Sequence, residues 1–192
     1  MIIPQVKNTE QNARAIFQRI VRSNTTPVID LDEVLFCAKH RQTLYSKDDV
    51  WRGKCGPDQV GQLDLDKYRS KTTRDLVMRD KNLPLLGLVT LLNDAGIDYH
   101  VATARVGCTH TLELLKSRGV RPRVLICREG EHDSRKDNVL KADGIRKHFP
   151  PCLRSRMILI DDNLSNCNTL RDLGMQVLQI TASDQLDIRD LI

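Results

Sequence analysis

Two aspartates in residues 27–36, Asp30 and Asp32, are the side chains with the clearest chemical capability in this sequence. They end an apolar run and are two positions apart, so both are expected to leave one strand end on the same side. Paired carboxylates in such a place can build a magnesium-assisted phosphoryl-transfer site, because Mg²⁺ prefers oxygen ligands. The Asp-x-Asp pattern also occurs in calcium loops and ordinary strand ends, so the hypothesis depends on further residues.

Two later apolar runs also end in polar residues. One ends at Thr103 and Arg105, and the other ends at the adjacent acids Asp161 and Asp162. Strand ends of a parallel sheet meet at one edge, where ligands bind in doubly wound folds. These four residues are therefore expected to converge with the first acidic pair.

A lysine enters from residues 134–141, at the start of an expected helix. Asp137 and Lys141 are four positions apart, so they share a helical face on which they can pair and aim the ammonium. Lys136 is the alternative lysine, and we take it as a solvent-facing neighbour.

Short β-branched or apolar runs alternate with amphipathic segments from Val28 onward, which is typical of βα units. We expect an α/β fold with a doubly wound, mainly parallel, five-stranded sheet. The expected strands are 28–31, 99–102, 124–127, 157–160 and 177–180. The expected helices are 83–95, 109–118, 138–148 and 165–173, three of which end at a glycine.

The remaining segments suggest a domain organisation. Residues 1–26 are expected to form an N-terminal helix, and residues 27–192 one domain with an inserted cap at about 37–80. The cap contains Trp51, the only tryptophan. With Tyr45 it can stack on a base while neighbouring basic residues meet phosphates, or it can anchor the cap to the body.

Composition narrows the class of protein. The 192 residues are 40% hydrophobic, which suits one globular core. The net charge of +5 permits a polyanionic partner, although most basic residues lie beside acids. Six cysteines without Cys-x-x-Cys spacing indicate reduced thiols, and no segment suits a signal peptide or membrane span, so a cytoplasmic protein is expected.

The ordered set Asp-x-Asp, Thr, Lys and Asp-Asp resembles the four motifs of the haloacid dehalogenase-like phosphatase superfamily, over residues 28–180. Within it, the sequence is most similar to the 3'-phosphatase module of bacteriophage polynucleotide kinase. That similarity rests on Arg41, on Arg105 in Thr-Ala-Arg, on residues 128–141 and on Ile-Asp-Asp at 160–162. The resemblance implies a Rossmann-like fold with a small cap, and it suggests a phage protein in a host cytoplasm.

The resemblance also implies roles for the motif residues. Asp30 attacks phosphorus to form an aspartyl-phosphate, and Asp32 serves as acid and then as base. Mg²⁺ is held by Asp30, the Asp32 carbonyl and the acids Asp161 and Asp162.

Three cations and two polar groups complete the implied site. Lys141 takes the motif lysine role with support from Asp137, while Thr103, Arg105 and Arg41 contact the phosphate. Departures from the pattern are Glu33 and Val34, which stand where glycine and threonine are usual.

The expected activity is that of a magnesium-dependent phosphomonoesterase acting on nucleic-acid 3' ends. A nucleotidase or other small-molecule phosphatase is the close alternative. A non-catalytic nucleic-acid-binding module, in which the acids hold a structural metal, is the more distant one. No Gly-x-x-x-x-Gly-Lys-Ser/Thr sequence occurs, so an attached kinase is not expected. The oligomeric state and the choice between DNA and RNA stay open.

Overall fold

A six-stranded parallel sheet forms the centre of the computed structural model, which describes residues 3–62, 64, 67–68, 71, 73–107, 109–130 and 132–182. The strand order is β1-β8-β7-β2-β5-β6. The strands are β1 (Gln5–Lys7), β2 (Thr26–Ile29), β5 (His100–Val106), β6 (Leu125–Arg128), β7 (Met157–Asp161) and β8 (Gln176–Thr181). The α/β class with a parallel sheet is confirmed, but the strand count of five is wrong.

The additional strand is β1, which pairs in parallel with β8 at one edge of the sheet. It has only three residues, whose side chains are exposed or half-buried, so it lacks the apolar run that marks the other strands. The N-terminal segment therefore adds an edge strand before its helix, α1 (Glu10–Ser23). The domain ends assigned at residues 1–2 and 183–192 lie outside the described residues.

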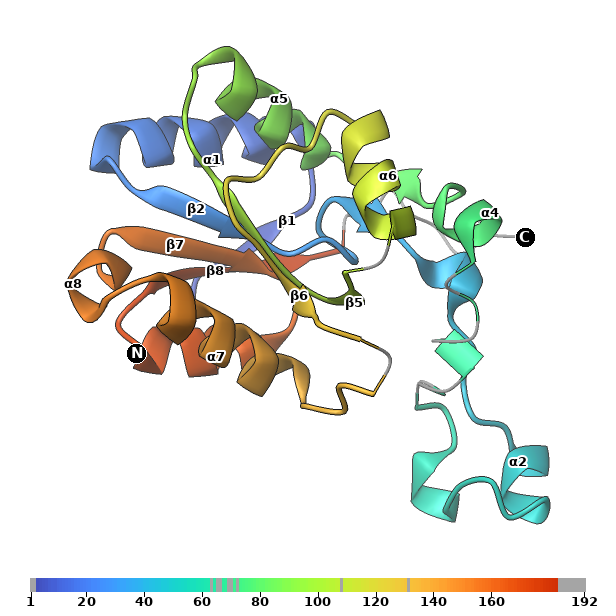
Figure 1. Cartoon of the computed structure of the whole chain (residues 1–192). Coiled ribbons are helices and arrows are strands. Elements are labelled where there is room, and N and C mark those ends of the chain that lie inside the picture. Colours follow the sequence, from blue (N-terminus) through green and yellow to red (C-terminus); the bar gives the residue numbers. More distant parts are fainter. Residues whose placement is uncertain are drawn as a thin grey trace.

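Helices cover both faces of the sheet (Figure 1). On one face, α1 packs with α5 (Leu86–Asp94) and α6 (Thr109–Ser117) on a shared apolar cluster. On the other face lie α7 (Asp137–His148) and α9 (Leu164–Asp172), with the short α8 (Pro151–Arg154) between them in sequence. Because helices cover both faces of the sheet, both faces of the central strands are buried, and their sequences are continuous apolar runs.

Strand β7 shows how the sequence directs side chains to the two faces. Ile158 and Ile160 join the α1 and α5 cluster, whereas Met157 and Leu159 join the α7 and α9 cluster. Because side chains alternate along a strand, Asp161 follows Leu159 onto the α7 side. The strand thereby delivers a carboxylate to the face from which α7 approaches.

The helix ends follow the signals in the sequence. Thr9 caps α1 by accepting a hydrogen bond from the Asn12 main-chain N–H, at 3.2 Å between Oγ1 and N. Gly96 and Gly119 have φ values of +64° and +70°, the left-handed conformation that glycine adopts without strain. The glycine stops expected after the helices at 83–95 and 109–118 are therefore confirmed.

The chain between β2 and α5 contains the insert, which a short antiparallel pair closes at its base. The pair consists of β3 (Phe36–Cys37) and β4 (Lys81–Asn82). Between them come the 3-10 turns η1 (Lys39–Arg41) and η2 (Pro57–Gln59) and the helices α2 (Lys47–Trp51) and α4 (Arg74–Val77). The part that carries α2 projects away from the body of the molecule (Figure 1).

Trp51 lies on this projecting part with 92% of its surface exposed. The anchoring role considered for this tryptophan is therefore wrong. Within the insert, polar contacts stabilise α2: the Asp49 carboxylate accepts hydrogen bonds from the Ser46 N–H and hydroxyl at 2.9 and 2.7 Å, which forms a capping box. A large aromatic side chain is left facing solvent.

Candidate active site

A cavity of about 230 Å³ opens at the carboxyl ends of β2, β5 and β7. Its lining consists of Asp30, Asp32, Glu33, Gln42, Tyr68, Ala104, Arg105, Val106, Arg128, Asp137, Lys141, Asp162, Asn163 and Asn166. Six of the nine residues that the sequence singled out are in this set. The other three, Thr103, Arg41 and Asp161, are buried next to lining residues.

Lys141 joins the first and last acidic motifs. Its Nζ lies 2.9 Å from Asp30 Oδ1 and 2.6 Å from Asp161 Oδ2, and its side chain is 1% exposed. Asp30 is itself held in place because its main-chain N–H donates to the Ile160 carbonyl at 2.9 Å. Lys136, by contrast, caps α7 at the surface, so the geometry favours Lys141 as the motif lysine.

Asp161 is oriented by the turn that leads into α9. The Asn166 Nδ2 group donates to both carboxylate oxygens at 3.0 and 3.1 Å, and the Asn163 main-chain N–H donates to Oδ1 at 2.9 Å. Asn163 also caps α9 by accepting from the Ser165 N–H. Sequence reasoning missed Asn166, although its place one helical turn into α9 puts it beside the strand end.

Three carboxylates form a group that could hold a cation. Ligand oxygens of Asp30, Asp161 and Asp162 all lie within 4.8 Å of one another. Burial raises the pKa of Asp30 well above its usual range; Lys141 offsets part of this effect, and the neighbouring carboxylates add to it. Burial and then the Asp161 charge raise the pKa of Asp162 to about 7.

This cluster fits a hard divalent cation. Its donors are all oxygens, and one ammonium cannot balance three closely spaced carboxylates. Mg²⁺ takes oxygen ligands and usually retains waters, which suits a cluster open to a cavity. The Asp32 side chain faces other partners, so any contribution from this residue would come through its main chain.

Asp32 pairs with Arg105 from β5. Arg105 Nη2 lies 2.6 Å from Oδ1, and Nε lies 3.1 Å from Oδ2. Burial alone would raise the pKa of Asp32, but the charge and hydrogen bonds of Arg105, together with the Arg41 charge and the Tyr68 hydrogen bond, hold it below its usual value. Tyr68, from the insert, donates to Oδ2 at 3.2 Å. In this arrangement Asp32 is a carboxylate, the form in which it can act as a base.

Asp80, which the sequence analysis did not single out, accepts hydrogen bonds from both Arg41 and Arg105. It is 1% exposed, and it accepts two hydrogen bonds from Arg41 at 2.9 Å and one from Arg105 Nη2 at 2.6 Å. Arg41 is also buried, at 1% exposed, so its direct contact with phosphate stays a prediction. No motif marks Asp80 in the sequence, because its role follows from the packing of the insert's end.

One nitrogen of the Arg105 guanidinium is available to a ligand. Its Nη1 atom is buried and has no hydrogen-bond partner among the described residues. Thr103 is fully buried on the same strand, and its hydroxyl accepts from the Arg105 main-chain N–H at 3.3 Å. Thr103 therefore helps to shape the β5 end, and its contact with phosphate also stays a prediction.

Asp137 has a different partner from the one expected. Its carboxylate accepts from Arg128 Nη2 at 2.7 Å, while Lys141 extends inward to Asp30. Arg128 also donates to the carbonyls of Ala104, Asp133 and Arg135 at 2.7–2.8 Å. Because Arg128 fastens the loop before α7, the expected Asp137–Lys141 pair is replaced by a clamp between β6 and the start of α7.

No protein-family model and no curated protein sequence matches the chain. Solved structures do match. A haloacid dehalogenase-like hydrolase from Streptococcus pneumoniae has 16% identity and a TM-score of 0.56, over 83% of this chain and 86% of that one. CbbY from Rhodobacter sphaeroides, in complex with phosphate, has 14% identity and a TM-score of 0.54, over 83% and 86%.

A third match is the structure of the Pnkp1/Rnl/Hen1 complex, at 16% identity and a TM-score of 0.54. It covers 83% of this chain but only 46% of the matched chain, so the chain spans less than half of that relative. Among the described residues, no helix is long and apolar enough to cross a membrane. The sheet order, the site at the strand ends and these likenesses together identify the fold as that of the haloacid dehalogenase-like hydrolases.

Proposed function

We propose that this protein is a magnesium-dependent phosphomonoesterase that works through an aspartyl-phosphate on Asp30. The observation that carries the proposal is the buried contact of Lys141 with both Asp30 and Asp161, beside a cavity that also reaches Asp32. Among the structural neighbours, CbbY was solved with phosphate and the HAD-hydrolase YfnB from Bacillus subtilis with magnesium, at 14% and 13% identity. Both support the proposed chemistry.

In the first step, an Asp30 oxygen attacks phosphorus while the bond from phosphorus to the ester oxygen breaks. The electron pair of that bond goes to the leaving oxygen, which takes a proton from Asp32. A bound Mg²⁺ would neutralise the acidic cluster and the incoming phosphate, as Lys141 does in part. Arg105, whose Nη1 has no hydrogen-bond partner among the described residues, is placed to meet a phosphate oxygen as well.

In the second step, Asp32 has become a carboxylate and removes a proton from water. The water oxygen attacks phosphorus, and the bond to Asp30 breaks to restore the free enzyme. Arg105 favours this ionised form of Asp32. For the first step, Asp32 must be protonated, which requires Arg105 to turn part of its hydrogen bonding toward the phosphate.

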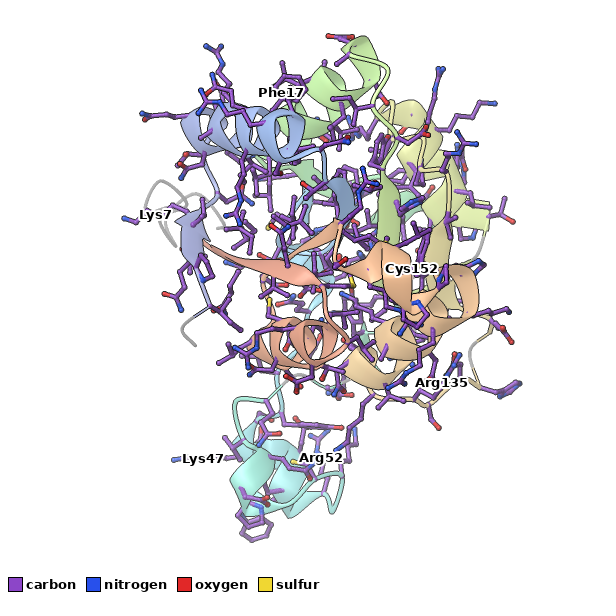
Figure 2. The ribbon with its side chains drawn as sticks, turned by 90° about the vertical axis from the view of Figure 1, so that its left-hand side faces the viewer. Lys7, Phe17, Lys47, Arg52, Arg135 and Cys152 are labelled. Carbon is purple, nitrogen blue, oxygen red and sulfur yellow. The ribbon has the colours of Figure 1, made fainter. Side chains whose placement is uncertain are left out.

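For the substrate, we propose a phosphorylated nucleic-acid 3' end. Trp51 is 92% exposed on the projecting part of the insert, where Lys47, Arg52 and Lys54 are exposed as well. Figure 2 shows Lys47 and Arg52 there, away from the body. Exposed aromatics among basic side chains can bind single strands by stacking and charge. One structural neighbour is described as an RNA repair complex, at 16% identity.

The test is magnesium-dependent phosphate release from a substrate panel. It includes an oligonucleotide with a 3'-phosphate, one with a 5'-phosphate, mononucleotides and a sugar phosphate. Asp30→Asn, which keeps the side-chain size, should abolish release, whereas Lys136→Ala at the α7 surface should not. Preference for the 3'-phosphorylated oligonucleotide supports the full proposal.

Other outcomes favour the alternatives. Release that depends on Asp30 but occurs only with small esters would make the protein a nucleotidase or metabolic phosphatase. Binding of oligonucleotides without any release would favour the non-catalytic module.

A further inference from the structure

Tyr68 is the one residue of the insert, among those described, whose side chain donates a hydrogen bond to a motif aspartate. Its hydroxyl lies 3.2 Å from Asp32 Oδ2 and it lines the cavity. The Arg41 guanidinium lies over its ring, at 4.9 Å from the centroid. No motif of the sequence includes Tyr68.

Main-chain hydrogen bonds between two segments of the insert, one around Thr43 and one around Asp64, hold Tyr68 in place. We call these paired segments the stem. The Tyr68 N–H donates to the Asp64 carbonyl at 2.9 Å, and the Asp64 N–H donates to the Thr43 carbonyl at 2.8 Å. Further out, Tyr45 and Gln62 are joined by a 2.9 Å main-chain hydrogen bond. The same stem therefore supports both the outer part of the insert and the hydroxyl at Asp32.

The partners of Asp32 differ in how they are affected by a phosphate. Arg105 is a cation with a buried Nη1 donor that no residue in the described part of the chain accepts from, so an incoming phosphate dianion competes with Asp32 for its hydrogen bonds. Tyr68 carries no charge and is fixed by the stem, so its hydrogen bond to Oδ2 can persist. Oδ1, which Arg105 Nη2 contacts at 2.6 Å, then becomes the oxygen available to the leaving group.

We infer that Tyr68 is a positioning residue for Asp32, holding one carboxyl oxygen so that the other protonates the leaving oxygen. The inference rests on the proposed phosphatase function and adds to it a role for the insert in the chemical step. The proton moves from Asp32 to the ester oxygen as the bond to phosphorus breaks. Tyr68 keeps its own proton and stabilises the carboxylate that forms.

If Tyr68 positions the acid, the effect of removing its hydroxyl depends on the leaving group of the substrate. If Tyr68 only stabilises the fold, the effect is the same for every leaving group. An alkoxide, such as the sugar oxygen of a 3'-phosphate, must be protonated as it leaves, whereas p-nitrophenolate leaves without a proton. Tyr68→Phe removes only the hydroxyl. We expect it to slow kcat about tenfold with a 3'-phosphorylated oligonucleotide and less than about twofold with p-nitrophenyl phosphate, because the lost hydrogen bond positions Asp32 for a proton transfer that only the first leaving group needs.

The experiment compares both substrates for wild type, Tyr68→Phe, Asp32→Asn and Thr43→Val. Asp32→Asn removes the acid and the base together, so it should slow both substrates, and the 3'-phosphorylated oligonucleotide more. Thr43→Val, which removes a hydroxyl that accepts a hydrogen bond from Lys71 at 2.8 Å in the same part of the insert, should show no loss. Thermal unfolding confirms that each variant is folded. Equal losses on the two substrates, or no loss on either, would overturn the role of Tyr68. Retention of activity in Asp30→Asn would instead overturn the proposed function itself.

Discussion

The Lys141 ammonium lies 2.9 Å from Asp30, inside a site where both side chains are almost wholly removed from solvent. Lys141 comes from α7 and Asp30 from the end of β2, so the contact joins the helix layer to the centre of the sheet. Since the same ammonium reaches Asp161, the lysine binds the first and last acidic motifs together. Catalysis and stability should therefore both depend on it.

Replacing Lys141 by methionine should abolish activity and destabilise the fold. The change leaves Asp30 and Asp161 buried without their cation, and breaking such a pair costs about 3–5 kcal/mol. For a chain of this size the loss corresponds to a fall of about 10 °C in Tm. Differential scanning calorimetry measures it, with Lys136→Met as the surface control. A Tm within about 2 °C of wild type would contradict the buried pairing.

Asp80→Asn should weaken the arginine pair and lower activity. Asp80 accepts hydrogen bonds from both Arg41 and Arg105, so an amide would leave two buried guanidinium groups poorly compensated. We expect a loss of about 3 kcal/mol in the free energy of unfolding and at least a tenfold fall in kcat. Urea unfolding and phosphate release check these effects, with the exposed Asp75→Asn as control. An unchanged kcat would separate Asp80 from the site.

The sequence predicted the centre of this site far better than its surroundings. Asp30, Asp161 and Asp162 sit at strand ends, where local alternation and chain order fix their positions. Asp80 and Tyr68 belong to a long insert whose folding depends on contacts distant in sequence. No periodic pattern reports such contacts.

Two further differences have the same origin. Strand β1 was missed because an exposed edge strand of three residues carries no apolar run. The partner of Asp137 was predicted wrongly. A helical spacing of four shows which residues share a face, but it cannot show that Arg128 from β6 donates a hydrogen bond to the Asp137 carboxylate. Local rules predicted the fold class, and tertiary contacts decided the pairs.

Trp51→Ala should weaken binding of an oligonucleotide without affecting a small ester. Stacking of a base on an aromatic ring contributes about 1–3 kcal/mol, so KM for the 3'-phosphorylated oligonucleotide should rise about tenfold. kcat with p-nitrophenyl phosphate should stay unchanged. Leu44→Ala, at another exposed apolar residue of the insert, is the control. An equal KM for both proteins would remove Trp51 from substrate recognition.

His100 should make the stability fall at acidic pH. Burial lowers its pKa below the usual value; the Asp98 charge opposes this effect, and the charges of Arg123 and His148 add smaller lowering contributions. The unfolded chain then binds more protons than the native one below about pH 6.5, so stability is present above that pH and is lost as pH falls.

The measurement is the Tm of wild type and His100→Phe between pH 5 and 8. The variant keeps an aromatic ring against Phe149, whose centroid lies 4.7 Å from the histidine ring. We expect the difference in Tm between the two proteins to change by a few degrees in favour of the variant as pH falls, since one pKa unit corresponds to about 1.4 kcal/mol. Parallel curves would show that His100 does not titrate differently on unfolding.

The central claim, that Asp30 carries the phosphoryl group, is tested most directly by acid-quenched single turnover with magnesium and a 3'-phosphorylated oligonucleotide, followed by peptide mass spectrometry. The Asp32→Asn variant is included with p-nitrophenyl phosphate, whose leaving group needs no proton, because loss of the base should then prolong the intermediate. We expect the mass of one phosphoryl group on the peptide containing Asp30, and its absence in Asp30→Asn. Two results would contradict the account. One is product formation at full rate with no phosphorylated peptide in any sample, and the other is undiminished phosphate release by Asp30→Asn.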